Sequence, residues 1–198
     1  PEVEPKITQG HAGTAIPHES AHLHVTGQAC YTDDINMPSN TLFAYVGLSH
    51  ASHATIKSLD LDAVRSAHGV VSVITADDIP GLKDIGPVIP GDPLITKSSD
   101  EFYGQVLFAV AATSQSDARR AARLAKVEYD LLPADLDIEA GRNSNSYVSP
   151  MHCQQKGNVD FAIDNAPFSL EGKFASGGQE QMYLEGQVSI AIPQEDGN

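Results

Sequence analysis

The chain has 198 residues, 41% of them hydrophobic, which is enough for one sizeable core or two small ones. Its 26 acidic and 12 basic residues give a net charge of −14, which disfavours nucleic acid or an anionic membrane as a partner. No run approaches the roughly 18 apolar residues of a membrane span, and the opening residues lack the charge and apolar core of a signal peptide.

The two cysteines, Cys30 and Cys153, lie far apart and form no Cys-x-x-Cys pair. They cannot by themselves assemble a zinc ribbon or an iron–sulfur site. Reduced thiols are the simplest interpretation, which predicts a cytoplasmic protein.

Residues 1–29 predict an extended arm, because the opening to Gly13 is charged and has no sustained periodicity. Within the arm, residues 18–22 match H-E-x-x-H, which on a helix would place His18 and His22 as zinc ligands with Glu19 as general base. A zinc hydrolase is therefore one alternative. Gly27 would end such a helix soon after His22, and no later helix offers a third ligand, so a polar arm is favoured.

The compact part of the chain begins near residue 42. Stretches 42–49 and 54–59 predict two strands separated by a short turn. A helix should follow, with Asp60 as its N-cap and Gly69 as its left-handed stop. The apolar run 70–74 then predicts a buried strand.

A second unit of similar layout follows the Pro- and Gly-rich loop 81–100. The apolar run 106–112 predicts a central strand, and 126–129 predicts another. Between them a helix capped by Ser114 or Ser116 is indicated by alanines that recur on one face. The opposite face carries arginines, which we interpret as solvated and not as an anion site: Arg119, Arg120 and Arg123.

The C-terminal part has a different character. Residues 139–158 have the composition of a linker. Beyond them, 168–174 and 188–192 predict an extended pair of strands flanking a polar segment. In that segment Gly177 and Gly178 allow a sharp turn or a close approach to a bound group, and Gln179 offers a donor and an acceptor without a charge. From these residues alone, a hairpin turn and a binding site both remain possible.

Residues 177–185, Gly-Gly-Gln-Glu-Gln-Met-Tyr-Leu-Glu, resemble the G-G-Q-[DE]-H-[FM]-Y-L-E signature of the xanthine dehydrogenase and aldehyde oxidase family of molybdenum hydroxylases. Residues 25–35 are similar to the family's V-T-G-x-A-x-Y-x-D-D-[IL] motif. The resemblance implies that Gln179 lies beside molybdenum, contacting its oxo or hydroxo ligand, with Gly177 and Gly178 in the cofactor site. Gln181 departs from the family, which has His there, so the resemblance assigns it no role.

The resemblance also implies the fold, an α+β chain in which an α/β hammerhead domain is followed by the first strands of a larger molybdenum-binding domain. We expect an arm at 1–29, the hammerhead domain at 30–138, a linker at 139–158 and the start of the molybdenum-cofactor-binding domain at 159–198. In relatives that last domain continues much further, and most contacts to molybdopterin belong to it.

The function implied by the resemblance is that of a xanthine dehydrogenase, which hydroxylates a purine or N-heterocycle with oxygen from water. Electrons would pass to [2Fe-2S] and FAD centres in other domains or subunits of a larger oligomer, and the remaining molybdenum-binding part would be a partner. No catalytic residue maps onto this chain, so we expect the chain alone to be inactive. An aldehyde oxidase or nicotinate-type dehydrogenase, and a noncatalytic hammerhead assembly module, are the alternatives.

Overall fold

The computed structural model describes residue 13 and residues 15–183 and 186–195. The chain divides into two compact units. One comprises residues 38–171, and the other combines residues 1–37 with 172–198. The larger unit holds every strand found in the described part of the chain.

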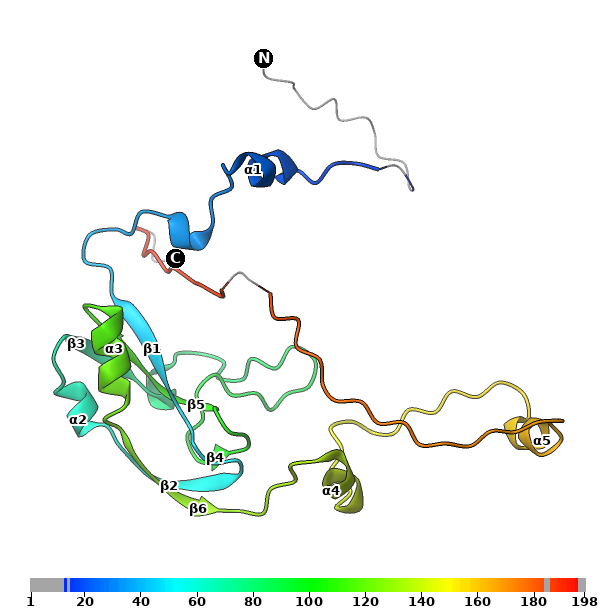
Figure 1. Ribbon diagram of the computed structural model, residues 1–198. Coiled ribbons are helices and arrows are strands. Elements are labelled where there is room, and N and C mark those ends of the chain that lie inside the picture. Colours follow the sequence, from blue (N-terminus) through cyan, green and yellow to red (C-terminus); the bar gives the residue numbers. More distant parts are fainter. Residues whose placement is uncertain (1–12, 14, 184–185, 196–198) are drawn as a thin grey trace. The chain divides into compact units, whose positions relative to one another are not determined.

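Residues 38–171 are built on two antiparallel three-stranded sheets (Figure 1). The first has the order β1-β5-β3, with β1 at Phe43–Leu48, β5 at Val106–Ala112 and β3 at Val70–Ile74. The second has the order β4-β2-β6, with β4 at Ser99–Asp100, β2 at Ala54–Asp60 and β6 at Lys126–Leu131. The mixed helix and sheet architecture confirms the predicted fold class.

Two helices and a 3₁₀ turn accompany the sheets: α2 at Asp62–Arg65, η2 at Ala76–Asp78 and α3 at Gln115–Ala122. The helix α3 begins where Ser114 Oγ accepts a hydrogen bond from the Asp117 backbone N–H, which satisfies an otherwise unpaired helical donor. Its apolar face consists of small residues that pack closely: Ala118, Ala121 and Ala122. Two further short helices, α4 at Ile138–Asn143 and α5 at Val159–Asp164, follow the second sheet in sequence.

The core of this unit lies around β5, the middle strand of its sheet. Phe108 and Val110 on one face of β5 are almost fully buried, together with Val64 of α2 and Ala121 of α3. On the neighbouring strand β1, Gly47 pairs with Phe108, and a Cβ at this position would overlap the Phe108 ring. The adjacent Leu107, at the register shift between β1 and β5, is buried as well, so burial along β5 departs from strict alternation.

Several expectations about these elements are confirmed and others are wrong. The apolar run 106–112 is the central strand, as predicted. Gly69 is left-handed with φ at +77°, but it does not end α2, which stops earlier at Arg65 with Ser66 as its C-cap. Residues 70–74 form a strand, but β3 lies at a sheet edge and only Val73 is buried. Asp60 is not the cap of α2. Leu61 holds that position, while Asp60 Oδ1 accepts from the Asp62 backbone N–H at 3.0 Å.

In the smaller unit, the arm predicted to be extended at 1–29 contains helix α1 at Ala21–Thr26. A 3₁₀ turn, η1 at Thr32–Asp34, follows it. Gly27 ends α1 in a left-handed conformation with φ at +72°, as its position after the histidines predicted. The part of the arm before residue 13, together with residue 14, lies outside the described residues.

The two strands predicted at 168–174 and 188–192 do not form in the described chain, where both stretches have no ladder partner. A strand requires hydrogen bonds from a neighbouring strand, so an apolar stretch without such a neighbour does not become part of a sheet. Its side chains are exposed accordingly, Phe168 by 91% and Phe174 by 91%. The predicted linker 139–158 also begins within helix α4, which Asp137 caps by accepting from the Ala140 backbone N–H at 2.7 Å. The domain boundaries themselves stay predictions.

Candidate functional site

The glutamine singled out by the sequence, Gln179, lies in an exposed stretch without helix or strand. Its side chain makes no hydrogen bond to the other residues that the structure describes. A neutral amide in this state keeps both its donor and its acceptor available for a bound group. In its chemistry Gln179 therefore fits a role beside an oxygen ligand of a metal, and that role stays a prediction.

The glycines before it are less constrained than the sequence suggested. Neither Gly177 nor Gly178 has a left-handed backbone, and a Cβ at either position would meet nothing within 4 Å among the described atoms. The left-handed residue of this segment is Met182, with φ at +46°. Among the described residues the glycine pair forms no hairpin turn, and its predicted place in a cofactor site stays a prediction.

The remaining polar residues of the segment give no second site group. Glu180 and Gln181 are exposed, and Glu185 lies outside the described residues. Within the described part of the chain, none of these side chains is hydrogen-bonded to Gln179. Gln179 and Gln181 are thus both exposed amides, and only the family resemblance distinguishes Gln179 as the site group.

A hollow of about 940 Å³ in the smaller unit joins two stretches that the sequence did not connect. One wall is residues 31–34, from the Val-Thr-Gly motif region, and the other is residues 186–189, just after the segment that carries Gln179. The first wall is ordered locally, because Asp34 Oδ2 accepts from the Tyr31 backbone N–H at 3.0 Å. The spacing of the two stretches in the sequence gave no signal that they meet, because 31–34 lie within one family-like motif whereas 186–189 only follow the other.

The H-E-x-x-H pattern is not laid out as a zinc motif requires. His18 precedes α1, and its Nδ1 accepts from the Ser20 backbone N–H at 3.2 Å, whereas His22 lies within the helix. The two imidazoles therefore do not share one helical face. Across the described ranges, no group of three or more His, Cys, Asp or Glu side chains is arranged to hold a metal ion.

The arginines of α3 and the two cysteines are exposed in the structure. Arg119 and Arg123 of α3 and its end are exposed, and Arg120 forms an ion pair with Asp117. Cys30 and Cys153 are exposed free thiols, and a cytoplasmic location stays a prediction. In the part of the chain that is described, no helix has both the length and the apolar character needed to cross a membrane.

Comparison with known proteins identifies the fold of the larger unit. Residues 26–133 match the family described as aldehyde oxidase and xanthine dehydrogenase, a/b hammerhead domain. The chain belongs to the aldehyde oxidase and xanthine dehydrogenase family. This membership confirms the resemblance from which the hammerhead domain was predicted.

Among curated members of this family, xanthine dehydrogenase from Oryza sativa subsp. japonica is 37% identical over 97% of this chain and 14% of its own length. Aldehyde oxidase 4 from Mus musculus is also 37% identical, over 97% of this chain and 14% of its own length. The chain therefore spans about 14% of the length of these relatives.

Solved structures of family members share the fold. The aldehyde oxidoreductase from Desulfovibrio desulfuricans matches with a TM-score of 0.58 at 31% identity, over 65% of this chain and 16% of that chain. A Cu,Mo-CO dehydrogenase matches with a TM-score of 0.52 at 27% identity, over 65% of this chain and 16% of that chain. Members of the aldehyde oxidase and xanthine dehydrogenase family with different substrates in their names thus share this architecture.

Proposed function

We propose that this chain is the hammerhead-containing segment of a molybdenum hydroxylase, and that the intact enzyme is a xanthine dehydrogenase. The enzyme hydroxylates a purine or related N-heterocycle with oxygen derived from water. The observation that carries this proposal is the 37% identity to a xanthine dehydrogenase over 97% of the chain, which includes the segment around Gln179. Because the chain spans 14% of that relative, the activity belongs to a larger protein or complex.

The contribution of this chain to the reaction is the amide of Gln179. When bound, the molybdenum–molybdopterin cofactor supplies the hydroxylation chemistry and takes up the electrons of the oxidised substrate. Gln179 is exposed and unpaired among the described residues, so its amide can donate to, or accept from, an oxygen ligand of molybdenum without adding charge. Gly177 and Gly178 leave room for this approach.

The rest of the apparatus is assigned to partners. The remaining part of the molybdenum-binding subunit supplies most pterin contacts and the catalytic base, and [2Fe-2S] and FAD centres in other domains or subunits carry the electrons onward. No side chain of this chain is proposed as catalytic. We expect the 198 residues alone to be inactive, because one amide provides neither the base nor the cofactor cradle.

An aldehyde oxidase is the second candidate, supported by the equal 37% identity to aldehyde oxidase 4 over 97% of the chain. Hammerhead residues set turns, caps and packing, so they do not discriminate between substrates. The same hammerhead residues do not distinguish a nicotinate-type dehydrogenase either.

The proposal is tested on the intact complex purified from its source. Metal analysis is combined with turnover of xanthine and of a simple aldehyde, with the isolated chain as a control. Stoichiometric molybdenum and preferential xanthine turnover are the expected results. Preferential aldehyde turnover would favour the second candidate, zinc without molybdenum would favour a hydrolase, and absence of both metals would favour a noncatalytic assembly module.

A further inference from the structure

The larger unit contains a cavity of about 370 Å³ that lies apart in sequence from the segment around Gln179. Its walls come from both sheets and from the connections between them. Leu107 of β5 belongs to one sheet, Ile56 and Leu59 of β2 to the other, and Arg65 of α2 and Lys97 of the loop before β4 complete the lining. The size falls within the roughly 300–1,000 Å³ range of pockets for small molecules.

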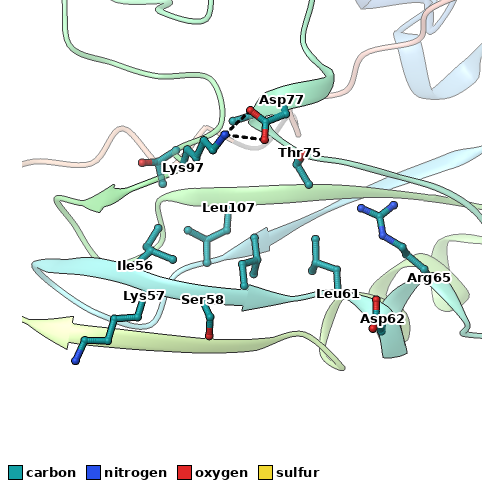
Figure 2. A pocket seen from close by; sticks show the side chains of 13 residues that line it. Ile56, Lys57, Ser58, Leu61, Asp62, Arg65, Thr75, Asp77, Lys97 and Leu107 are labelled. Carbon is teal, nitrogen blue, oxygen red and sulfur yellow. Dashed lines mark hydrogen bonds and ion pairs between the residues drawn. The ribbon is translucent and has the colours of Figure 1, made fainter.

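The floor of this cavity is apolar and well ordered by packing. Leu107 is 1% exposed and Leu61 is 6% exposed, and both belong to the core cluster against which Ile56 packs. Figure 2 shows the side chains of Ile56, Leu61 and Leu107 grouped together, with Lys57 pointing away from them. Lys57 is instead paired with Asp130 at 3.3 Å. Ile56 and Leu59 are only partly buried, so they give this floor its accessible apolar surface, whereas Leu61 and Leu107 are almost fully enclosed.

Two cationic groups stand at the edge of this floor. Arg65 donates from Nη1 to the Val73 backbone carbonyl at 3.3 Å, and it joins none of the ion pairs found among the described residues. Most donors of its guanidinium are therefore unoccupied by protein groups. The neighbouring carboxylate of Asp78 accepts instead from Thr75, from its backbone N–H at 2.7 Å and from its Oγ1 at 2.8 Å.

The second cation, Lys97, is paired with the carboxylate of Asp77 in an exposed ion pair. Its Nζ contacts both carboxylate oxygens of Asp77, at 2.7 and 2.8 Å, above the apolar floor in Figure 2. Both side chains are more than 60% exposed. Exposed ion pairs of this kind contribute little net stability, so an incoming anion can replace Asp77 at low cost.

We propose that this cavity binds a small amphipathic carboxylate, with its hydrocarbon part on Ile56 and Leu59 and its carboxylate on Arg65. Lys97 provides a second, exchangeable contact once Asp77 is displaced. The planar guanidinium suits a carboxylate because it can donate two parallel hydrogen bonds. One guanidinium with spare donors beside an apolar floor matches a singly charged acid better than a more highly charged phosphate ester. Asp62 also lines the cavity and disfavours a larger negative charge.

The test uses the whole 198-residue chain with hexanoate as the probe and hexanamide as its neutral counterpart, followed by ligand-observed NMR. Hexanoate should bind with a Kd on the order of 1 mM, as expected for a ligand of this size, and hexanamide at least about fivefold more weakly. The proposal would be overturned if hexanoate showed no detectable binding at a concentration about 10-fold above this expected Kd, or if hexanamide bound equally well.

Two variants make the test specific. Arg65→Gln should weaken hexanoate binding about tenfold, because a charged hydrogen-bond donor is lost, whereas Arg119→Gln, an equal charge change on α3, should leave it unchanged. Asp77→Asn should tighten binding at least about twofold by releasing Lys97. Circular dichroism verifies that each variant is folded. If Arg65→Gln is unfolded, the direction of the Asp77→Asn effect decides, and weaker or unchanged binding in that variant would contradict the proposal.

Discussion

Ser114 and Asp117 bind each other twice across the first turn of α3. Ser114 Oγ accepts from the Asp117 backbone N–H at 3.1 Å and donates to Asp117 Oδ2 at 2.6 Å. That donated hydrogen bond is the main reason why the pKa of the Asp117 carboxyl lies below its ordinary value, and His68 and Arg120 lower the pKa further while burial opposes them. The cap of α3 therefore includes an ionised carboxylate, so the stability of this helix should depend on pH.

The first prediction concerns stability against acid. The pKa of Asp117 is lowered in the folded chain, so its ionised form stabilises the fold. This stabilisation is fully present at pH values above the unfolded pKa of about 3.9, and it is lost as the pH falls through the lower folded pKa. Asp117→Asn should therefore be less stable than the parent chain at pH 7, and the difference should shrink at pH 3. Urea unfolding at both pH values measures this. Asp160→Asn, an exposed change elsewhere, is the control, and a difference for Asp117→Asn that does not vary with pH would contradict the argument.

The second prediction concerns the turn that faces the same carboxylate. Gly69 has φ at +77°, and a Cβ there would lie 2.8 Å from Asp117 Oδ2. Gly81 has nearly the same φ, +79°, but a Cβ would meet nothing within 4 Å. Gly81→Ala should cost about 1–2 kcal/mol from the left-handed backbone alone, and Gly69→Ala should cost at least about 1 kcal/mol more from overpacking. Denaturant midpoints measure both, and equal losses would mean that Asp117 moves aside without cost.

Local chemistry was enough to predict much of the hammerhead domain. The apolar run 106–112 predicted the central strand, Gly69 was predicted to be left-handed, and Ser114 was one of two candidates for the α3 cap, because each of these features depends on a few adjacent residues. The run 70–74 has the composition of a buried strand, yet β3 lies at an edge, since strand order depends on residues far away in sequence.

Contacts between residues far apart in the chain could not be predicted from the sequence. Asp100 appeared to belong to an irregular loop, but it is fully buried and accepts from Ser49 Oγ, and its Oδ1 has no partner among the described residues. The cavity beside Arg65 likewise depends on two sheets meeting. The segment around Gln179 is the reverse case. Sequence resemblance named its residues, but the described chain places no other element against them.

The third prediction concerns the histidines of the arm. His18 lies before α1 and His22 within it, so the pair lacks the one-face geometry of a zinc motif. Replacing both histidines with Ala in the intact complex should leave metal content and turnover unchanged. Elemental analysis and an activity assay check this together. Loss of one equivalent of zinc along with activity would show that the arm is a metal site.

The last prediction concerns Gln179, whose exposed amide is unpaired among the described residues. If it contacts an oxygen ligand of molybdenum in the intact enzyme, Gln179→Ala removes an oriented hydrogen bond and should lower turnover on the order of a hundredfold. Loss of a group that supports a metal site can also weaken metal retention by about 10–100-fold, so partial loss of molybdenum is expected. Gln179→Glu should also be impaired, because it adds a negative charge where a neutral amide is needed.

Gln181→Ala is the matched control for this experiment, since it removes an exposed amide two residues away at the position that departs from the family motif. It should change turnover much less than Gln179→Ala does. Thermal unfolding of the hammerhead domain should be unchanged in both variants, because both side chains are exposed and neither belongs to the buried core of that domain. If Gln179→Ala keeps turnover and molybdenum content within about twofold of the parent, then the glutamine has no part in the site, and the available amide of this segment is merely solvated.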